Sequence, residues 1–229
     1  MAEFDSAHRE RAQAVYQRLE EVYGIPEWRE PLEAMDELVS TILSQNTNDR
    51  NRDQAFHALR KVLPTWEEVR DAPVETVIEA IRPAGLGNQK GPRIQEVLRA
   101  ITAERGNLDL SFLKAYSDAN ALAWLMRFKG VGPKTAAIVL QFALGKAAFP
   151  VDTHVYRVSG RIGLRPDKIS VEEAHPYLSQ AFEPHQYGPG HLNLIRLGRE
   201  VCHARKPECP VCPVKALCKF YQGEVAQDE

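Results

Sequence analysis

Cysteine is absent from the first 201 residues of this chain, and all four cysteines lie between Cys202 and Cys218. Disulfides that stabilise a secreted protein would be spread along the sequence, and a cytosolic protein keeps its thiols reduced. The clustering therefore argues against a disulfide-stabilised fold and indicates a metal site near the C-terminus.

Long apolar runs are also missing. No stretch approaches the roughly 18 apolar residues of a membrane-spanning helix. The N-terminal sequence MAEFDSAHRERAQAVYQRLEEVYG lacks the apolar core of a signal peptide. We therefore expect a cytoplasmic protein with no membrane partner.

An excess of basic residues is the third absence. Lysine and arginine number 29 against 31 acidic residues, which gives a formal charge of −2 and a pI near 6.4. This balance counts modestly against a nucleic-acid partner, although affinity for phosphates depends on where the cations cluster.

What the sequence does contain is helical periodicity. Apolar residues recur at helical spacing over residues 32–43, 55–63, 74–81 and 94–101, separated by short connectors that contain proline or glycine. No segment alternates as a strand would. The pattern predicts an all-α fold of about ten short helices.

A tight turn, Lys129-Gly130-Val131-Gly132, separates two of the expected helices, at residues 119–128 and 133–145. Glycine lets a phosphate approach the backbone closely, and the N–H groups at the start of the second helix could bind a phosphate oxygen. The turn could equally be a plain helix connection.

Lys134 lies at the start of that second helix, where the helix dipole disfavours a cation. Asp152 follows 18 residues later and is predicted to cap a helix that begins after it. A capping aspartate is more often structural than catalytic, but these two side chains at neighbouring helix starts suggest a shared cleft.

Four segments together resemble one family. The stretch GVGPKTAAIVLQFALGKAAFPVDTHVYR (130–157) resembles the helix-hairpin-helix and Gly/Pro/Asp motif of endonuclease III DNA glycosylases, and the spacing C-x6-C-x2-C-x5-C resembles that family's [4Fe–4S] loop. Residues 38–49 and 85–90 are similar to its two lesion-proximal loops.

The resemblance implies two helical domains on either side of a DNA-binding cleft. Residues 27–147 would form a six-helix, barrel-like domain with the hairpin, and residues 1–26 and 148–229 would form the [4Fe–4S] cluster domain. It implies a nucleoid-associated monomer that excises oxidised or damaged pyrimidines from double-stranded DNA and cleaves at abasic sites.

The resemblance also assigns roles to residues. Lys134 would attack C1′ of the sugar and form a Schiff base, while Asp152 stabilises the transition state and assists proton transfer. Only a neutral amine attacks. The positive end of a helix favours that form, whereas a nearby Asp152 would favour the charged form, and the sequence leaves the balance between the two open. The turn residues Lys129, Gly130, Val131 and Gly132 would hold a DNA phosphate.

Extrusion of a base leaves a gap that wedge residues fill. The family's glutamine aligns with Asn46, with Gln45 just before it, and either side chain could fill the gap. Leu86 is the expected apolar wedge on the second loop, although ordinary core packing would explain it equally well.

Four thiolates within 17 residues fit zinc or an iron–sulfur cluster. Only Cys209 and Cys212 form the close pair that zinc sites favour, and the family resemblance implies that Cys202, Cys209, Cys212 and Cys218 hold a [4Fe–4S] cluster. The loop between the first two would present Arg205 and Lys206 to DNA phosphates.

Two other functions are open at this stage. A non-catalytic DNA-binding module would need neither Lys134 nor Asp152. A monofunctional adenine- or mismatch-specific glycosylase carries a serine in place of the lysine and a catalytic glutamate where this chain has Thr41, so the sequence disfavours it.

Overall fold

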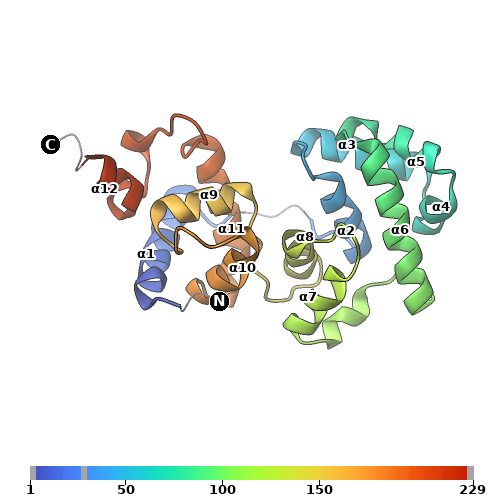
Figure 1. Ribbon diagram of the computed structural model, residues 1–229, viewed down its shortest axis with the longest axis horizontal. Coiled ribbons are helices and arrows are strands. Elements are labelled where there is room, and N and C mark those ends of the chain that lie inside the picture. The colour runs from blue at the N-terminus through green and yellow to red at the C-terminus, as the bar shows by residue number, and fades with distance from the viewer. Residues whose placement is uncertain (1–3, 27–29, 226–229) are drawn as a thin grey trace. The chain divides into compact units, whose positions relative to one another are not determined.

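The computed structural model describes residues 4–26 and 30–225 and confirms the all-α prediction. Over these residues the chain forms twelve α-helices and no strand (Figure 1). None of the described helices has both the length and the apolar character needed to span a bilayer. The chain divides into two compact units, which are Met1–Glu30 with Ala147–Glu229 (unit 1) and Pro31–Lys146 (unit 2).

The predicted domain limits can be placed beside this division. The first, between residues 26 and 27, falls at the edge of residues outside the described ranges. The second, between residues 147 and 148, lies one residue beyond the division at Lys146.

Unit 2 contains seven of the described α-helices, one more than the six expected. They are α2 (Ala34–Leu43), α3 (Asp49–Val62), α4 (Trp66–Asp71), α5 (Val74–Ala80), α6 (Gly87–Arg105), α7 (Asp118–Met126) and α8 (Pro133–Ile138). Helix α4, which is six residues long, is the one that the sequence pattern did not predict, and its start is fixed by a capping box between Thr65 and Glu68. The four apolar stripes identified in the sequence lie mainly in α2, α3, α5 and α6.

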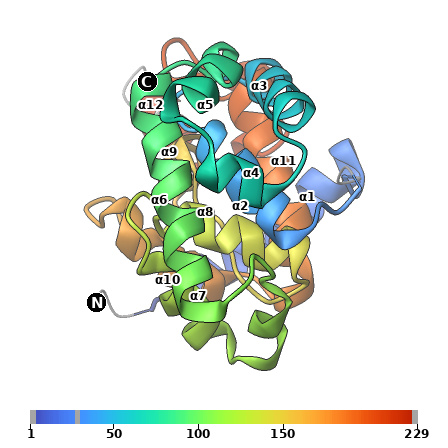
Figure 2. The same cartoon turned by 90° about the vertical axis from the view of Figure 1, so that its right-hand side faces the viewer.

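Helix α6 is the long element of unit 2 and packs against α2, α4 and α5 (Figure 2). Its apolar stripe, Ile94, Val97, Leu98 and Ile101, is buried. Two glycines in its first turns allow the close approach of α5, because a Cβ on Gly91 would lie 2.8 Å from Cγ1 of Ile78 and one on Gly87 would lie 3.3 Å from Cγ2 of the same residue.

Unit 1 combines the N-terminal helix with the C-terminal part of the chain. Its helices are α1 (Ser6–Tyr23), α9 (Thr153–Ile162), α10 (Val171–Ala181), α11 (Tyr187–Glu200) and α12 (Lys219–Val225). Helix α11 packs against α9 and α1, and α1 also packs against α10. The core they share includes Val15, Leu19, Val155, Val158 and Leu194. Burial of these side chains against elements distant in sequence is the main stabilising contribution of the unit.

Candidate functional site

The predicted tight turn lies between α7 and α8 in unit 2. Helix α7 ends at Met126, two residues earlier than expected, and α8 begins at Pro133. Gly130 has a φ of +88°, which side-chain-bearing residues rarely adopt, and Cδ of Arg93 would lie only 2.0 Å from a Cβ at this position. Gly132 is extended and provides no side-chain cap to α8. Lys129 is exposed and Val131 is buried.

The helix after the turn is shorter than predicted. Helix α8 is α-helical only to Ile138, and residues Val139–Ala143 continue it as a π-helical turn instead of an α-helix to residue 145. Such π turns are often found at functional sites.

Lys134, the predicted nucleophile, is the second residue of α8 and is partly buried. Its Nζ lies 3.5 Å from Oγ of Ser44, just after the end of α2. Ser44 Oγ in turn donates a hydrogen bond to the carbonyl oxygen of Thr41 at 2.7 Å. Since a hydroxyl has one proton to donate, Ser44 presents lone pairs to the lysine nitrogen and can only accept from it.

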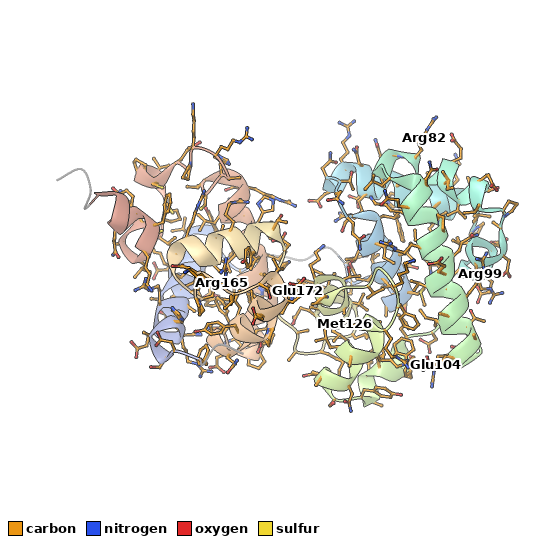
Figure 3. The ribbon with its side chains drawn as sticks, viewed as in Figure 1. Arg82, Arg99, Glu104, Met126, Arg165 and Glu172 are labelled. Atoms are coloured by element: carbon orange, nitrogen blue, oxygen red, sulfur yellow. The ribbon has the colours of Figure 1, made fainter. Side chains whose placement is uncertain are left out.

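The two loops that carry the predicted wedge residues also belong to unit 2. We define the first loop as residues 44–48, after α2, and the second loop as residues 85–86, before α6. Asn46 is exposed with a φ of +54°, and Leu86 is 46% exposed with a φ of +53°. Leu86 is therefore not a core residue. Arg82, in the 3₁₀ turn just before the second loop, also points outward (Figure 3).

Gln45 and Asn46 differ in their surroundings. The side-chain amide of Gln45 donates to the carbonyl oxygen of Gly130 at 3.1 Å and so joins the first loop to the tight turn. Asn46 is the exposed member of the pair.

The burial of several polar residues near these loops was not inferred from the sequence. Thr41 is 4% exposed and its hydroxyl donates to Glu37, itself 1% exposed, at 3.3 Å. Lys90, on α6, is 3% exposed, and burial lowers the pKa of its ammonium group. A lysine placed four residues before Ile94 falls on the apolar stripe of α6, and that position was the available signal.

Asp152 lies in unit 1 and is the N-cap of α9, as predicted. One carboxylate oxygen accepts a hydrogen bond from the backbone N–H of Val155 at 2.8 Å. The side chain is partly buried. Its second carboxylate oxygen can accept further hydrogen bonds in addition to the one that caps the helix.

All four cysteines lie in unit 1, and they line one pocket together with Arg161, Val201 and Phe220. Burial raises the pKa of the Cys212 and Cys218 thiols. Among the described residues, no three His, Cys, Asp or Glu side chains are grouped so that they could hold a metal ion.

The loop between Cys202 and Cys209 is anchored at its start by Arg161. The guanidinium of Arg161 donates to the carbonyl oxygens of His203 at 2.6 Å and Ala204 at 3.0 Å. Arg205 and Lys206 are exposed beyond this anchor.

Comparison with known proteins identifies the family of this chain. Residues 39–184 match the family model described as HhH-GPD superfamily base excision DNA repair protein. Endonuclease III of Thermotoga maritima is 34% identical over 192 residues, which cover 82% of this chain and 85% of that protein.

Two solved structures match the fold with a TM-score of 0.82 and 26% identity, over 95% of this chain and 98% of theirs. One is a non-covalent Endonuclease III–DNA complex and the other is a trapped Endonuclease III–DNA covalent intermediate. From the family match and these relatives, the chain belongs to the HhH-GPD superfamily of base excision DNA repair proteins.

Proposed function

We propose that this endonuclease III-like glycosylase is bifunctional, and that it removes oxidised or damaged pyrimidines from duplex DNA and then cleaves the strand at the abasic site. The observation that carries the proposal is the placement of Lys134. It lies directly after the glycine turn, at the start of α8. Its amine lies 3.5 Å from the hydroxyl of Ser44, whose proton is donated to the carbonyl oxygen of Thr41.

The chemistry divides into two steps. The neutral Lys134 amine attacks C1′ of the extruded nucleotide, and the base leaves with the electrons of the glycosidic bond and takes up a proton. Opening of the sugar ring transfers the electrons of the C1′–O4′ bond to the oxygen and gives a Schiff base. Loss of a C2′ proton then expels the 3′ phosphate by β-elimination.

Ser44 and Asp152 have separate tasks in this scheme. Because Ser44 accepts from Lys134, it holds one N–H bond of the amine in either charge state and so orients the lone pair. Asp152 keeps one oxygen on the α9 cap, and its carboxylate charge would stabilise the cationic sugar in the transition state. This assignment makes Asp152 both a structural and a catalytic group.

Duplex DNA is the proposed partner. The turn Lys129–Gly132 would hold a phosphate through backbone N–H groups, with Lys129 supplying an exposed cation. Arg205 and Lys206 would add phosphate contacts from unit 1. The solved relatives described as DNA complexes support this proposal.

Asn46 and Leu86 are the proposed gap-filling residues. Both side chains are exposed on loops, whereas the Gln45 amide is used by Gly130. The structure therefore supports Asn46 over Gln45 as the polar wedge.

The four cysteines are the proposed ligands of a [4Fe–4S] cluster. All four line one pocket, and only Cys209 and Cys212 form the close pair that zinc sites favour. The similarity to Endonuclease III relatives supports the cluster. A bound cluster would cross-link the loop that carries Arg205 and Lys206.

Borohydride trapping on a duplex with one abasic site tests the lyase. Wild type should form a covalent adduct, and Lys134→Arg, which keeps the positive charge, should form none. Lys114→Ala removes an exposed lysine elsewhere in unit 2 and should trap as wild type does. Efficient base removal by wild type without an adduct would instead identify a monofunctional glycosylase.

Iron analysis tests the cofactor. Protein purified without oxygen should contain about four iron atoms and four acid-labile sulfides per chain, and Cys209→Ser should lose them. Stoichiometric zinc without iron would contradict the proposed cluster.

A further inference from the structure

Lys90 is a buried cation with two backbone partners. Its Nζ donates to the carbonyl oxygen of Leu43 at 2.8 Å and to that of Ala84 at 2.8 Å. With 3% exposure the side chain is screened from solvent, so these two hydrogen bonds take the place of water around the ammonium.

The two carbonyls belong to different segments, and each ends a helical element. Leu43 is the last residue of α2, which has no basic residue in its last turn, and Ala84 ends the 3₁₀ turn Arg82–Ala84. The last carbonyls of a helix have no partner within it and carry partial negative charge. Lys90 thus places one cation against both carbonyls at once.

Each of these carbonyls immediately precedes one of the two loops. Asn46 follows Leu43 by three residues, and Leu86 follows Ala84 by two. In the described part of the chain only three non-glycine residues have a positive φ, and these two are among them. Such backbone conformations persist where the surrounding structure imposes them.

We propose that Lys90 is a positioning residue, which fixes the first and second loops relative to each other so that Asn46 and Leu86 enter the gap left by an extruded base together. Lys90 would touch neither the DNA nor the reacting atoms. This inference rests on the proposed function, in which those two side chains fill the gap.

The same helix offers a matched control. Gln95, five residues further along α6 and 2% exposed, also binds two backbone carbonyls, those of Val69 at 2.9 Å and Ala72 at 2.8 Å. These carbonyls belong to α4 and its end, not to the wedge loops. Gln95→Met and Lys90→Met therefore remove the same kind of two-carbonyl contact at different places in unit 2.

The experiment measures binding to a duplex with a tetrahydrofuran abasic-site analogue and to the same duplex undamaged. Lys90→Met should lower the ratio of the two affinities about tenfold, as expected when a loop conformation loses ~1.4 kcal/mol of support. 2-Aminopurine opposite the analogue should show a smaller fluorescence change, because the gap is filled less often. Gln95→Met should keep the wild-type ratio.

A merely structural role gives a different result. The positioning role is overturned if Lys90→Met retains the wild-type ratio of the two affinities. It is also overturned if Gln95→Met lowers that ratio as much as Lys90→Met does when both variants lose the same Tm. Should Lys90→Met fail to fold, Lys90→Gln retains an uncharged donor, and its ratio should fall between wild type and a tenfold loss. An unchanged ratio in that variant would also contradict the proposal.

Failure of the proposed function is seen separately. Absence of wild-type borohydride trapping would refute the lyase and leave the binding ratio measurable. If the wild type does form the adduct, Lys90→Met should reduce the rate of trapping about tenfold more on duplex abasic DNA than on single-stranded abasic DNA. Single-stranded DNA has no gap to fill. Equal losses on both substrates would overturn the Lys90 inference alone.

Discussion

The side-chain amide of Gln45 donates a hydrogen bond to the carbonyl oxygen of Gly130 at 3.1 Å. This contact joins residues 85 positions apart and ties the first loop to the turn before α8. The loop proposed to fill the gap and the turn proposed to hold a phosphate are thereby linked within unit 2. The bond also occupies the side-chain amide of Gln45, and the proposed wedge is therefore its exposed neighbour, Asn46.

Substitution at the two neighbouring positions should separate these tasks. Asn46→Gly keeps the left-handed backbone, which glycine adopts readily, so the free energy of unfolding should change by less than about 1 kcal/mol. The affinity ratio for abasic-analogue over undamaged duplex should fall about tenfold, because the wedge is lost. Gln45→Ala should instead cost about 1 kcal/mol of stability and weaken binding to both duplexes. A normal ratio in Asn46→Gly would contradict its role as a wedge.

The two glycines of the turn should respond differently to alanine. Gly130→Ala forces a side chain into a positive φ and against Arg93, so we expect a loss of about 3 kcal/mol in unfolding free energy. Gly132→Ala is the control, since its φ is −86° and no atom lies within 4 Å of a Cβ there. It should change stability by less than about 0.5 kcal/mol. Denaturant unfolding of the two variants checks the difference, and equal losses would refute the explanation.

Features that depend on nearby residues could be predicted from the sequence. The apolar stripes gave the positions of α2, α3, α5 and α6, because burial of one helix face imposes a local period. The cap at Asp152 was also predictable, since a cap needs only the side chain and the next three residues.

Features that depend on tertiary partners could not be predicted. Nothing near Lys134 in the sequence indicates Ser44, 90 positions away, as its neighbour. The position of Lys90 on the apolar stripe of α6 indicates burial, but nothing near it in the sequence identifies the carbonyls of α2 and of the 3₁₀ turn as its partners. The change from α- to π-helix at Val139 was likewise not predictable, because residues 139–143 contain no proline or glycine.

Acid should destabilise unit 1 through His8. This imidazole is 8% exposed, and Nδ1 lies 2.6 Å from the hydroxyl of Tyr177. Burial lowers the pKa of His8 below its usual 6.5. The unfolded chain therefore binds a proton at His8 more readily than the folded chain does. The stability that the neutral imidazole contributes is fully present above pH 6.5 and is lost as the pH drops from there through the lowered pKa. The free energy of unfolding of His8→Gln should depend less on pH over this window, and an equal dependence would rule out His8 as the source.

Two substitutions of Asp152 should distinguish its role as a helix cap from its proposed role in catalysis. Asn caps a helix about as well as Asp, so Asp152→Asn should keep the hydrogen bond from Val155 and the wild-type Tm. Asp152→Ala should lose about 1 kcal/mol with the cap. Both variants lack the carboxylate, and base removal under single-turnover conditions should fall about 10²–10⁴-fold in each. Full activity in Asp152→Asn would show that the residue is only a cap, since the one group this variant lacks is the negative charge proposed to stabilise the sugar cation.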